Sequence, residues 1–167
     1  MHPACVTLNH HWGYCAADHD YKRPANVVRA LVECVSKNGN LILNVGPDAR
    51  GNIPAESVEI LKQVGKWMRL NGASIYGCGA AGPEKPEWGR YTCKGKHLYA
   101  HILERGIGPV SLEGLQGKVK SVRMLRDGSE INISRPWNAA NDRDLYLNLP
   151  SAQLPDARDT VADIELL

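Results

Sequence analysis

Two adjacent histidines, His10 and His11, are the residues best suited to chemistry near neutral pH, because imidazole titrates in that range. Asp18 and His19 follow in the same segment, and imidazole and carboxylate groups together could transfer protons or bind a metal. A catalytic zinc site normally has three protein ligands, and no third ligand occurs here at a useful spacing. We therefore expect surface or supporting histidines, with no metal and no cofactor.

The carboxylates of the first half do not form a recognisable catalytic pair. Glu33 falls on the polar side of a predicted helix, and Glu56 falls in the first turn of another, where a negative charge suits the helix dipole. Asp48 follows a predicted strand, so it could contact a bound glycan or shape a turn. Asp18 and Asp20 have no evident partner of their own kind. We identify no catalytic residue from the sequence.

The five cysteines indicate free thiols. Their number is odd, their spacing is wide and no CxxC pair occurs, which argues against a disulfide framework and a structural zinc site. Cys34 falls on an apolar helix, as expected for a partly buried thiol. Residues 1–5 also lack a basic segment and an apolar run of the signal-peptide kind. These features favour a cytoplasmic location as a starting expectation, although Met1 could equally be an internal start or a truncation point.

The bulk properties are those of a globular protein of one domain or two small ones. Hydrophobic residues make up 43% of the 167 residues and charged residues 23%, close to ordinary globular usage. A net charge of +2 without a Lys/Arg-rich stripe argues against a nucleic-acid partner. No apolar run approaches the length of a membrane span, so no membrane partner is expected.

The first half has the order helix, strand, helix. Apolar residues recur at three- and four-residue spacing over residues 24–37 and 54–70, which predicts two amphipathic helices. Each is followed by Asn-Gly, a normal stop signal. Residues 40–45 have a continuous apolar centre, as in a strand buried on both faces of a parallel sheet. This order is typical of an α/β barrel or a doubly wound sheet.

The second half has a different pattern, in which short alternating segments are separated by Gly and Pro. Residues 77–86 contain five such residues and are predicted to be a linker. The segments beyond it predict a small antiparallel β-sandwich. The predicted strands are residues 90–93, 97–103, 109–112, 118–125, 130–133, 145–149 and 161–166.

Three segments together resemble the α-L-fucosidases of glycoside hydrolase family 29, of the bacterial type. Residues 5–14 end in His-Trp-Gly-Tyr and are similar to a family stretch with Cys-x-Thr before Trp-Gly-Tyr. Residues 31–47 read LVECVSKNGNLILNVGP, close to the family's LVDVVSKNGNLLLNIGP. Residues 51–54 and 60–77 resemble the family's DGTIP and ILREVGKWLKVNGEAIYG. The order and spacing make the match specific over residues 4–77, whereas the rest is less specific.

The resemblance implies that residues 1–79 are the last part of a (β/α)8-like catalytic barrel and that residues 80–167 are a C-terminal β-sandwich. Residues 40–45 would be the final barrel strand. Chemistry in such barrels gathers at the carboxyl ends of the strands, so Asn44, Asp48 and the loop around Trp12 would lie near that face.

The family's enzymes are retaining exo-glycosidases, which need two carboxyl groups about 5–5.5 Å apart. The family's nucleophile is an Asp upstream of the Trp-Gly-Tyr segment, and its acid/base and fucose-binding histidines also lie on earlier loops. None has a counterpart here, so the resemblance implies a fragment without activity of its own. Relatives often carry Trp-Glu where this chain has His2 and Pro3.

Trp12 is the candidate substrate-binding residue. By resemblance its ring would face the methyl group of fucose, and apolar surface suits a 6-deoxy sugar; packing within a loop is the other interpretation. Tyr14 is expected to be structural. Trp88 and Trp137 could form a sugar-stacking surface on the sandwich, although buried aromatic residues are common in small β cores.

Three hypotheses remain open. The first is a fragment of an α-L-fucosidase, whose partners are a fucosylated glycan or fucoside and the N-terminal part of the catalytic domain. The second is a stand-alone carbohydrate-binding module that uses the sandwich. The third is a degraded gene product that folds poorly, for which a protease-resistant core beginning near residue 82 would show that only the sandwich folds by itself.

Overall fold

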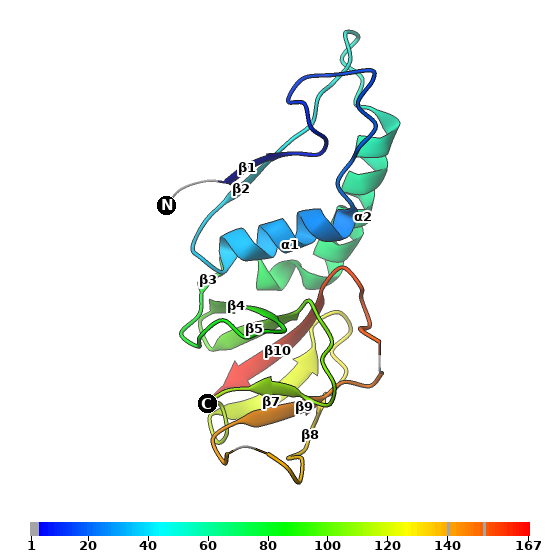
Figure 1. Ribbon diagram of the computed structural model, residues 1–167. Helices are drawn as coiled ribbons and strands as arrows, with labels where there is room; N and C mark the ends of the chain where they lie inside the picture. Colours follow the sequence, from blue (N-terminus) through cyan, green and yellow to red (C-terminus); the bar gives the residue numbers. More distant parts are fainter. Residues whose placement is uncertain (1–3, 140, 152) are drawn as a thin grey trace.

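In the computed structural model, which describes residues 4–139, 141–151 and 153–167, two helices lie between a pair of parallel strands and a set of antiparallel strands. The pair β1–β2 is at one end of the molecule, and the antiparallel sheets are at the other (Figure 1). The mainly β character of the second half agrees with the sequence prediction. Positions His2 and Pro3 lie outside the described residues.

The parallel pair consists of β1 (Ala4–Thr7) and β2 (Leu41–Asn44). They run in register from Ala4 opposite Leu41 to Thr7 opposite Asn44, so both strands end at the same edge. The sequence predicted β2 but missed β1. Four residues are too short for a clear alternating pattern, and β1 is identified by its pairing with a strand 37 positions further along the chain.

The two helices are α1 (Pro24–Val35) and α2 (Ala55–Asn71), within two residues of their predicted bounds. The first ends as expected, since Asn38 has a φ of 57° and such a residue commonly ends a helix. The second ends differently, because Gly72 keeps a helical φ and begins the short 3-10 helix η1 (Gly72–Ser74).

Two antiparallel sheets form the second half. The larger has the order β3-β4-β5-β10-β7 and the smaller the order β6-β9-β8. One apolar core lies between them, with Ile102, Leu112 and Leu147 fully buried. The strands are β3 (Gly79–Ala80), β4 (Gly89–Lys94), β5 (His97–Ile102), β6 (Val110–Leu112), β7 (Val119–Met124), β8 (Asn132–Ile133), β9 (Leu145–Asn148) and β10 (Thr160–Leu166).

The prediction of a plain linker over residues 77–86 is wrong in part, because β3 lies within it. Gly79 pairs with Cys93 and Ala80 with Thr92, while the amide of Ala80 donates to Oδ1 of Asn38, at 2.7 Å. A two-residue strand gives no periodicity signal of its own, so only these partners reveal it.

The helices cover the outer face of the larger sheet. Along β5, Leu98 and Ile102 face the core between the sheets, while Tyr99 packs with Val28 and Trp67 of the helices. This division follows from the alternation of side chains along a strand. The helical part and the larger sheet therefore share a second apolar core.

Candidate functional site

The edge where β1 and β2 end carries the segment that contains Trp12. The side-chain nitrogen of Asn44 donates to the carbonyl oxygen of Trp12 at 2.7 Å and to Oγ1 of Thr7 at 3.2 Å. The hydroxyl of Thr7 in turn donates to the carbonyl oxygen of His11 at 3.1 Å. The last residues of the two strands thus fix the backbone of residues 11 and 12. We call the whole segment of residues 8–23 the Trp12 loop.

Gly46 allows the Trp12 loop to lie directly against the end of β2. A Cβ atom at this position would lie 2.7 Å from the carbonyl carbon of Gly13 and 2.8 Å from the amide nitrogen of Tyr14. Both distances are shorter than carbon and nitrogen atoms tolerate, so a larger residue would displace the loop. Sequence reasoning treated Gly46 only as the end of a strand, because a contact of this kind has no local signal.

The Trp12 side chain is 54% exposed, and Tyr14 is 53% exposed. The loop backbone is therefore held by hydrogen bonds, while about half of the surface of Trp12 and of Tyr14 is open to solvent. The position of Trp12 beside Asn44 agrees with the expected grouping at this edge, but its contact with a sugar stays a prediction.

His10 and His11 bind to carboxylates of their own loop. Nδ1 of His11 lies 2.7 Å from Oδ2 of Asp18, and Nε2 of His10 lies 2.8 Å from Oδ2 of Asp20. The amide of His10 also donates to Asp18, at 2.9 Å. The hydrogen bond from His11 is the main reason that the pKa of Asp18 is lowered to about 2. These contacts organise the loop, and the described residues contain no group of three or more metal-ligating side chains.

Asp48 closes a turn. Its Oδ1 accepts hydrogen bonds from the amides of Arg50 and Asn52, both at 2.8 Å. The bonds from Asn52 hold the pKa of the Asp48 carboxyl below its usual range. Glu33 instead forms ion pairs with Lys37 and with Arg90 of β4, so it joins α1 to the larger sheet.

The two tryptophans of the second half differ in their surroundings. Trp88 packs against the core between the sheets, and its Nε1 donates to the carbonyl oxygen of Ser111 at 2.9 Å. Trp137 is 98% exposed. Of the expected sugar-stacking pair, one ring is therefore held in place and the other projects into solvent.

All five cysteines are free thiols, with Cys5 exposed and the other four partly buried. Burial raises the pKa of Cys34 and of Cys78. Among the described residues, no helix is long and apolar enough to cross a membrane.

Residues 2–73 match a protein-family model that is described as α-L-fucosidase. The chain is 33% identical over 156 residues to the tissue α-L-fucosidase of Macaca fascicularis, covering 86% of the chain and 31% of that relative. The chain thus spans about a third of the length of this relative and of the tissue α-L-fucosidase of Homo sapiens.

Two solved structures extend the match to both halves. α-L-Fucosidase isoenzyme 1 from Paenibacillus thiaminolyticus is 63% identical with a TM-score of 0.95, covering 99% of this chain and 39% of that one. A family 29 α-L-fucosidase from Bacteroides thetaiotaomicron, trapped as a covalent intermediate with 2-fluoro-fucosyl fluoride, is 26% identical with a TM-score of 0.85. It is matched over 99% of this chain and 38% of its own.

Proposed function

Because the chain belongs to the α-L-fucosidases of glycoside hydrolase family 29, we propose that it is the C-terminal part of a retaining exo-α-L-fucosidase that removes terminal fucose from glycans. The observation that carries this proposal is the edge where Thr7 and Asn44 hold the Trp12 loop. This edge lies within the residues that match the family model.

The open parallel pair supports a place in a (β/α)8-like barrel. Among the described residues β1 pairs only with β2, and β2 only with β1, so each has a free edge that another strand could occupy. The order β1, α1, β2, α2 is that of two successive βα units, which is the repeat that a barrel wall would need. We propose that residues 1–79 belong to the barrel, that residues 80–167 form the β-sandwich, and that the remaining strands come from the N-terminal part of the catalytic domain.

We infer that the carboxylates of this chain do not perform the chemical step. A retaining mechanism forms a covalent glycosyl-enzyme intermediate on one carboxylate, while a second carboxyl group protonates the leaving oxygen and later activates water. Such an intermediate has been trapped in the Bacteroides relative. Here Asp18 and Asp48 accept hydrogen bonds within their own loops. We infer that both catalytic carboxylates come from the rest of the enzyme, and that this chain alone does not turn over a fucoside.

Trp12 would bind the substrate. Its half-exposed indole offers apolar surface at the strand edge where barrel enzymes carry out their chemistry. The methyl group of fucose would gain from contact with that surface, whereas the hydroxymethyl group of a related hexose would lose water without gaining a hydrogen bond. Trp12 is therefore proposed as a specificity contact, and Asn44 as the residue that positions it.

A chimera tests this proposal. The matching C-terminal part of the Paenibacillus enzyme is replaced by these 167 residues, and the release of 4-nitrophenol from its α-L-fucoside is measured. We expect activity from the chimera and none from the chain alone. In the chimera, Trp12→Ala should lower kcat/KM by about 10- to 100-fold, the equivalent of roughly 1.4–2.7 kcal/mol of lost transition-state binding.

The matched control is Trp137→Ala, which removes an exposed indole of the same size outside the Trp12 loop. An inactive but folded chimera, or turnover by the chain alone, would contradict the fragment proposal. Equal activity of the chimera with and without Trp12 would remove only the assigned role of that residue.

The stand-alone carbohydrate-binding module is the weaker candidate. The likeness to the Paenibacillus fucosidase covers 99% of the chain, the helical part as well as the sheets. A module built on the sheets alone would have no use for β1 and β2, whose open edges are a liability in an isolated protein.

A further inference from the structure

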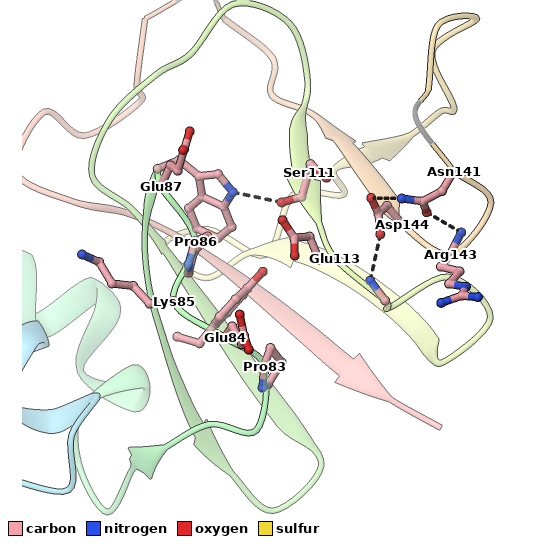
Figure 2. A pocket seen from close by; sticks show the side chains of 13 residues that line it. Pro83, Glu84, Lys85, Pro86, Glu87, Ser111, Glu113, Asn141, Arg143 and Asp144 are labelled. Carbon is pink, nitrogen blue, oxygen red and sulfur yellow. Dashed lines mark hydrogen bonds between the residues drawn. The ribbon is translucent and has the colours of Figure 1, made fainter.

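A pocket of about 650 Å³ opens on the second half of the molecule, away from the Trp12 loop. Figure 2 shows three of its walls: residues 83–87 before β4, residues 111–113 at the end of β6, and residues 141–144 before β9. Its volume falls within the range of roughly 300–1,000 Å³ that is typical of small-molecule sites.

Two aromatic rings line this pocket in a fixed arrangement. The rings of Trp88 and Tyr91 meet edge to face, with centroids 5.3 Å apart. The hydrogen bond from Nε1 of Trp88 to the carbonyl oxygen of Ser111, drawn in Figure 2, prevents the indole from turning. A ligand would therefore meet a preformed aromatic surface.

The phenol of Tyr91 is a third feature of the pocket. Tyr91 is only 6% exposed, and it lines the pocket beside Trp88. Burial, aided by the negative charge of Glu113, raises the pKa of Tyr91 well above its ordinary value, so the phenol keeps its proton. Glu113 lines the same pocket. A protonated phenol can both donate and accept a hydrogen bond, so it suits a ligand that carries hydroxyl groups.

The charged residues around the pocket favour a ligand without negative charge. Glu84, Glu87, Glu113 and Asp144 line it together with Lys85 and Arg143, so acidic groups outnumber basic ones and an anionic ligand is disfavoured. Asp144 is held by the amide of Gly114 and by Asn141, each at 3.0 Å. The described residues contain no cluster suited to a metal ion. A carboxylate held in place within a pocket that aromatic rings also line suits a neutral ligand with many hydroxyl groups, since a carboxylate is a strong acceptor for them.

We propose that this pocket binds a neutral saccharide, with its hydroxyl groups on Tyr91 and Glu113 and its ring against Trp88. The site is separate from the fucose contact proposed at Trp12, and it would bind a saccharide without taking part in the reaction. It would bind a part of the glycan other than the fucose that is removed, or a second glycan chain. Sequence reasoning placed a sugar surface on Trp88 and Trp137, but it missed Tyr91 and Glu113, which line one pocket only because the two sheets pack together.

The test uses the 167-residue chain itself. The ¹⁵N-labelled protein is titrated with lactose, a neutral disaccharide, and the indole N–H of Trp88 is followed by NMR together with the amides of residues 111–114. We expect saturable shifts confined to the pocket, with a Kd on the order of 1 mM. Tyr91→Phe removes only the hydroxyl group, so the fold should persist while the affinity falls about five- to tenfold, the size of one lost hydrogen bond.

Two variants complete the design. Glu113→Gln keeps the shape of the side chain and should also weaken binding, whereas Tyr76→Phe, on an exposed ring outside the pocket, should leave it unchanged. No shift at about 100 mM lactose would overturn the proposal, as would equal affinities of Tyr91→Phe and the unaltered protein. Binding of 3′-sialyllactose or glucosamine in preference to lactose would show a site for a charged ligand instead. None of these outcomes depends on the fucosidase activity of the chimera.

Discussion

The side-chain amide of Asn44, the last residue of β2, donates a hydrogen bond of 2.7 Å to the backbone carbonyl oxygen of Trp12, although 32 positions separate the two residues. The same nitrogen donates to Thr7 at the end of β1. One side chain therefore connects both strands of the parallel pair to the Trp12 loop, and it orders the backbone while the Trp12 ring stays half exposed.

Replacing Asn44 with alanine should loosen the Trp12 loop. The change removes two hydrogen bonds, each with a net value of about 0.5–1.5 kcal/mol, so we expect a loss of roughly 1–2 kcal/mol in the free energy of unfolding. Amide hydrogen exchange should become faster for residues 9–14 while the larger sheet keeps its protection. The control is Asn132→Ala, an exposed position on β8. Unchanged exchange in the loop of Asn44→Ala would show that other contacts, such as the close approach of Gly46 to Gly13, suffice to hold it.

The helices and most strands could be predicted because their signals are local. Apolar spacing placed α1 and α2, and Asn38 took the positive φ expected of it. β1 and β3 could not be predicted, since each is defined by a partner far along the chain. The same holds for the sites. The family motif pointed to Trp12, whereas nothing local in the sequence shows that Trp88, Tyr91 and Glu113 line one pocket.

Acid should weaken the Trp12 loop through Asp18. The hydrogen bond from His11 lowers the pKa of Asp18 from its ordinary 3.8 to about 2, so the folded protein favours the ionised carboxylate. A group whose pKa is lowered on folding contributes stability above its unfolded pKa, and that contribution is lost as the pH falls through the folded pKa. We expect Asp18→Asn to be less stable than the unaltered chain at pH 6, with the difference shrinking between pH 3.8 and about 2.

Denaturant midpoints of both proteins across this pH range would measure the effect. Asp20→Asn serves as the control, because Asp20 also binds a histidine of this loop but is exposed. A stability difference for Asp18→Asn that does not change with pH would contradict the assignment.

The second half should not be stable without the helices. Cutting before residue 82 removes β3 and both helices, which exposes Tyr99 and Val161 on the outer face of the larger sheet. It also removes Ser74 and Trp67, which hydrogen-bond to Thr92 and Asp159. Each large apolar side chain that becomes exposed costs about 1.5–3 kcal/mol, a sizeable part of the stability of a small domain.

We therefore expect the fragment 82–167 to lack a cooperative thermal transition and limited proteolysis of the full chain to yield no resistant core that begins near residue 82. A fragment that melts cooperatively at the temperature of the full chain would show that the sheets are an independent domain.

The last prediction concerns a buried polar chain beneath the helices. His101 and Asp159 are both fully buried, with Nδ1 of His101 2.6 Å from Oδ2 of Asp159. The hydroxyl of Thr92 donates to the carbonyl oxygen of Ser74, at 2.7 Å. It can then only accept from Nε2 of His101, at 3.0 Å. Nε2 therefore carries a proton, and one further proton lies between Nδ1 and the Asp159 carboxyl group.

Asp159→Ala leaves His101 without its partner in a dry interior, and breaking a buried pair in this way costs roughly 3–5 kcal/mol. Asp159→Asn should cost distinctly less, because its amide can donate to Nδ1 of a neutral imidazole that still donates through Nε2 to Thr92. Thermal melts of the two variants beside the unaltered chain measure the difference. Equal destabilisation would mean that the charge of Asp159, rather than a hydrogen bond to His101, is what the junction between helices and sheet requires.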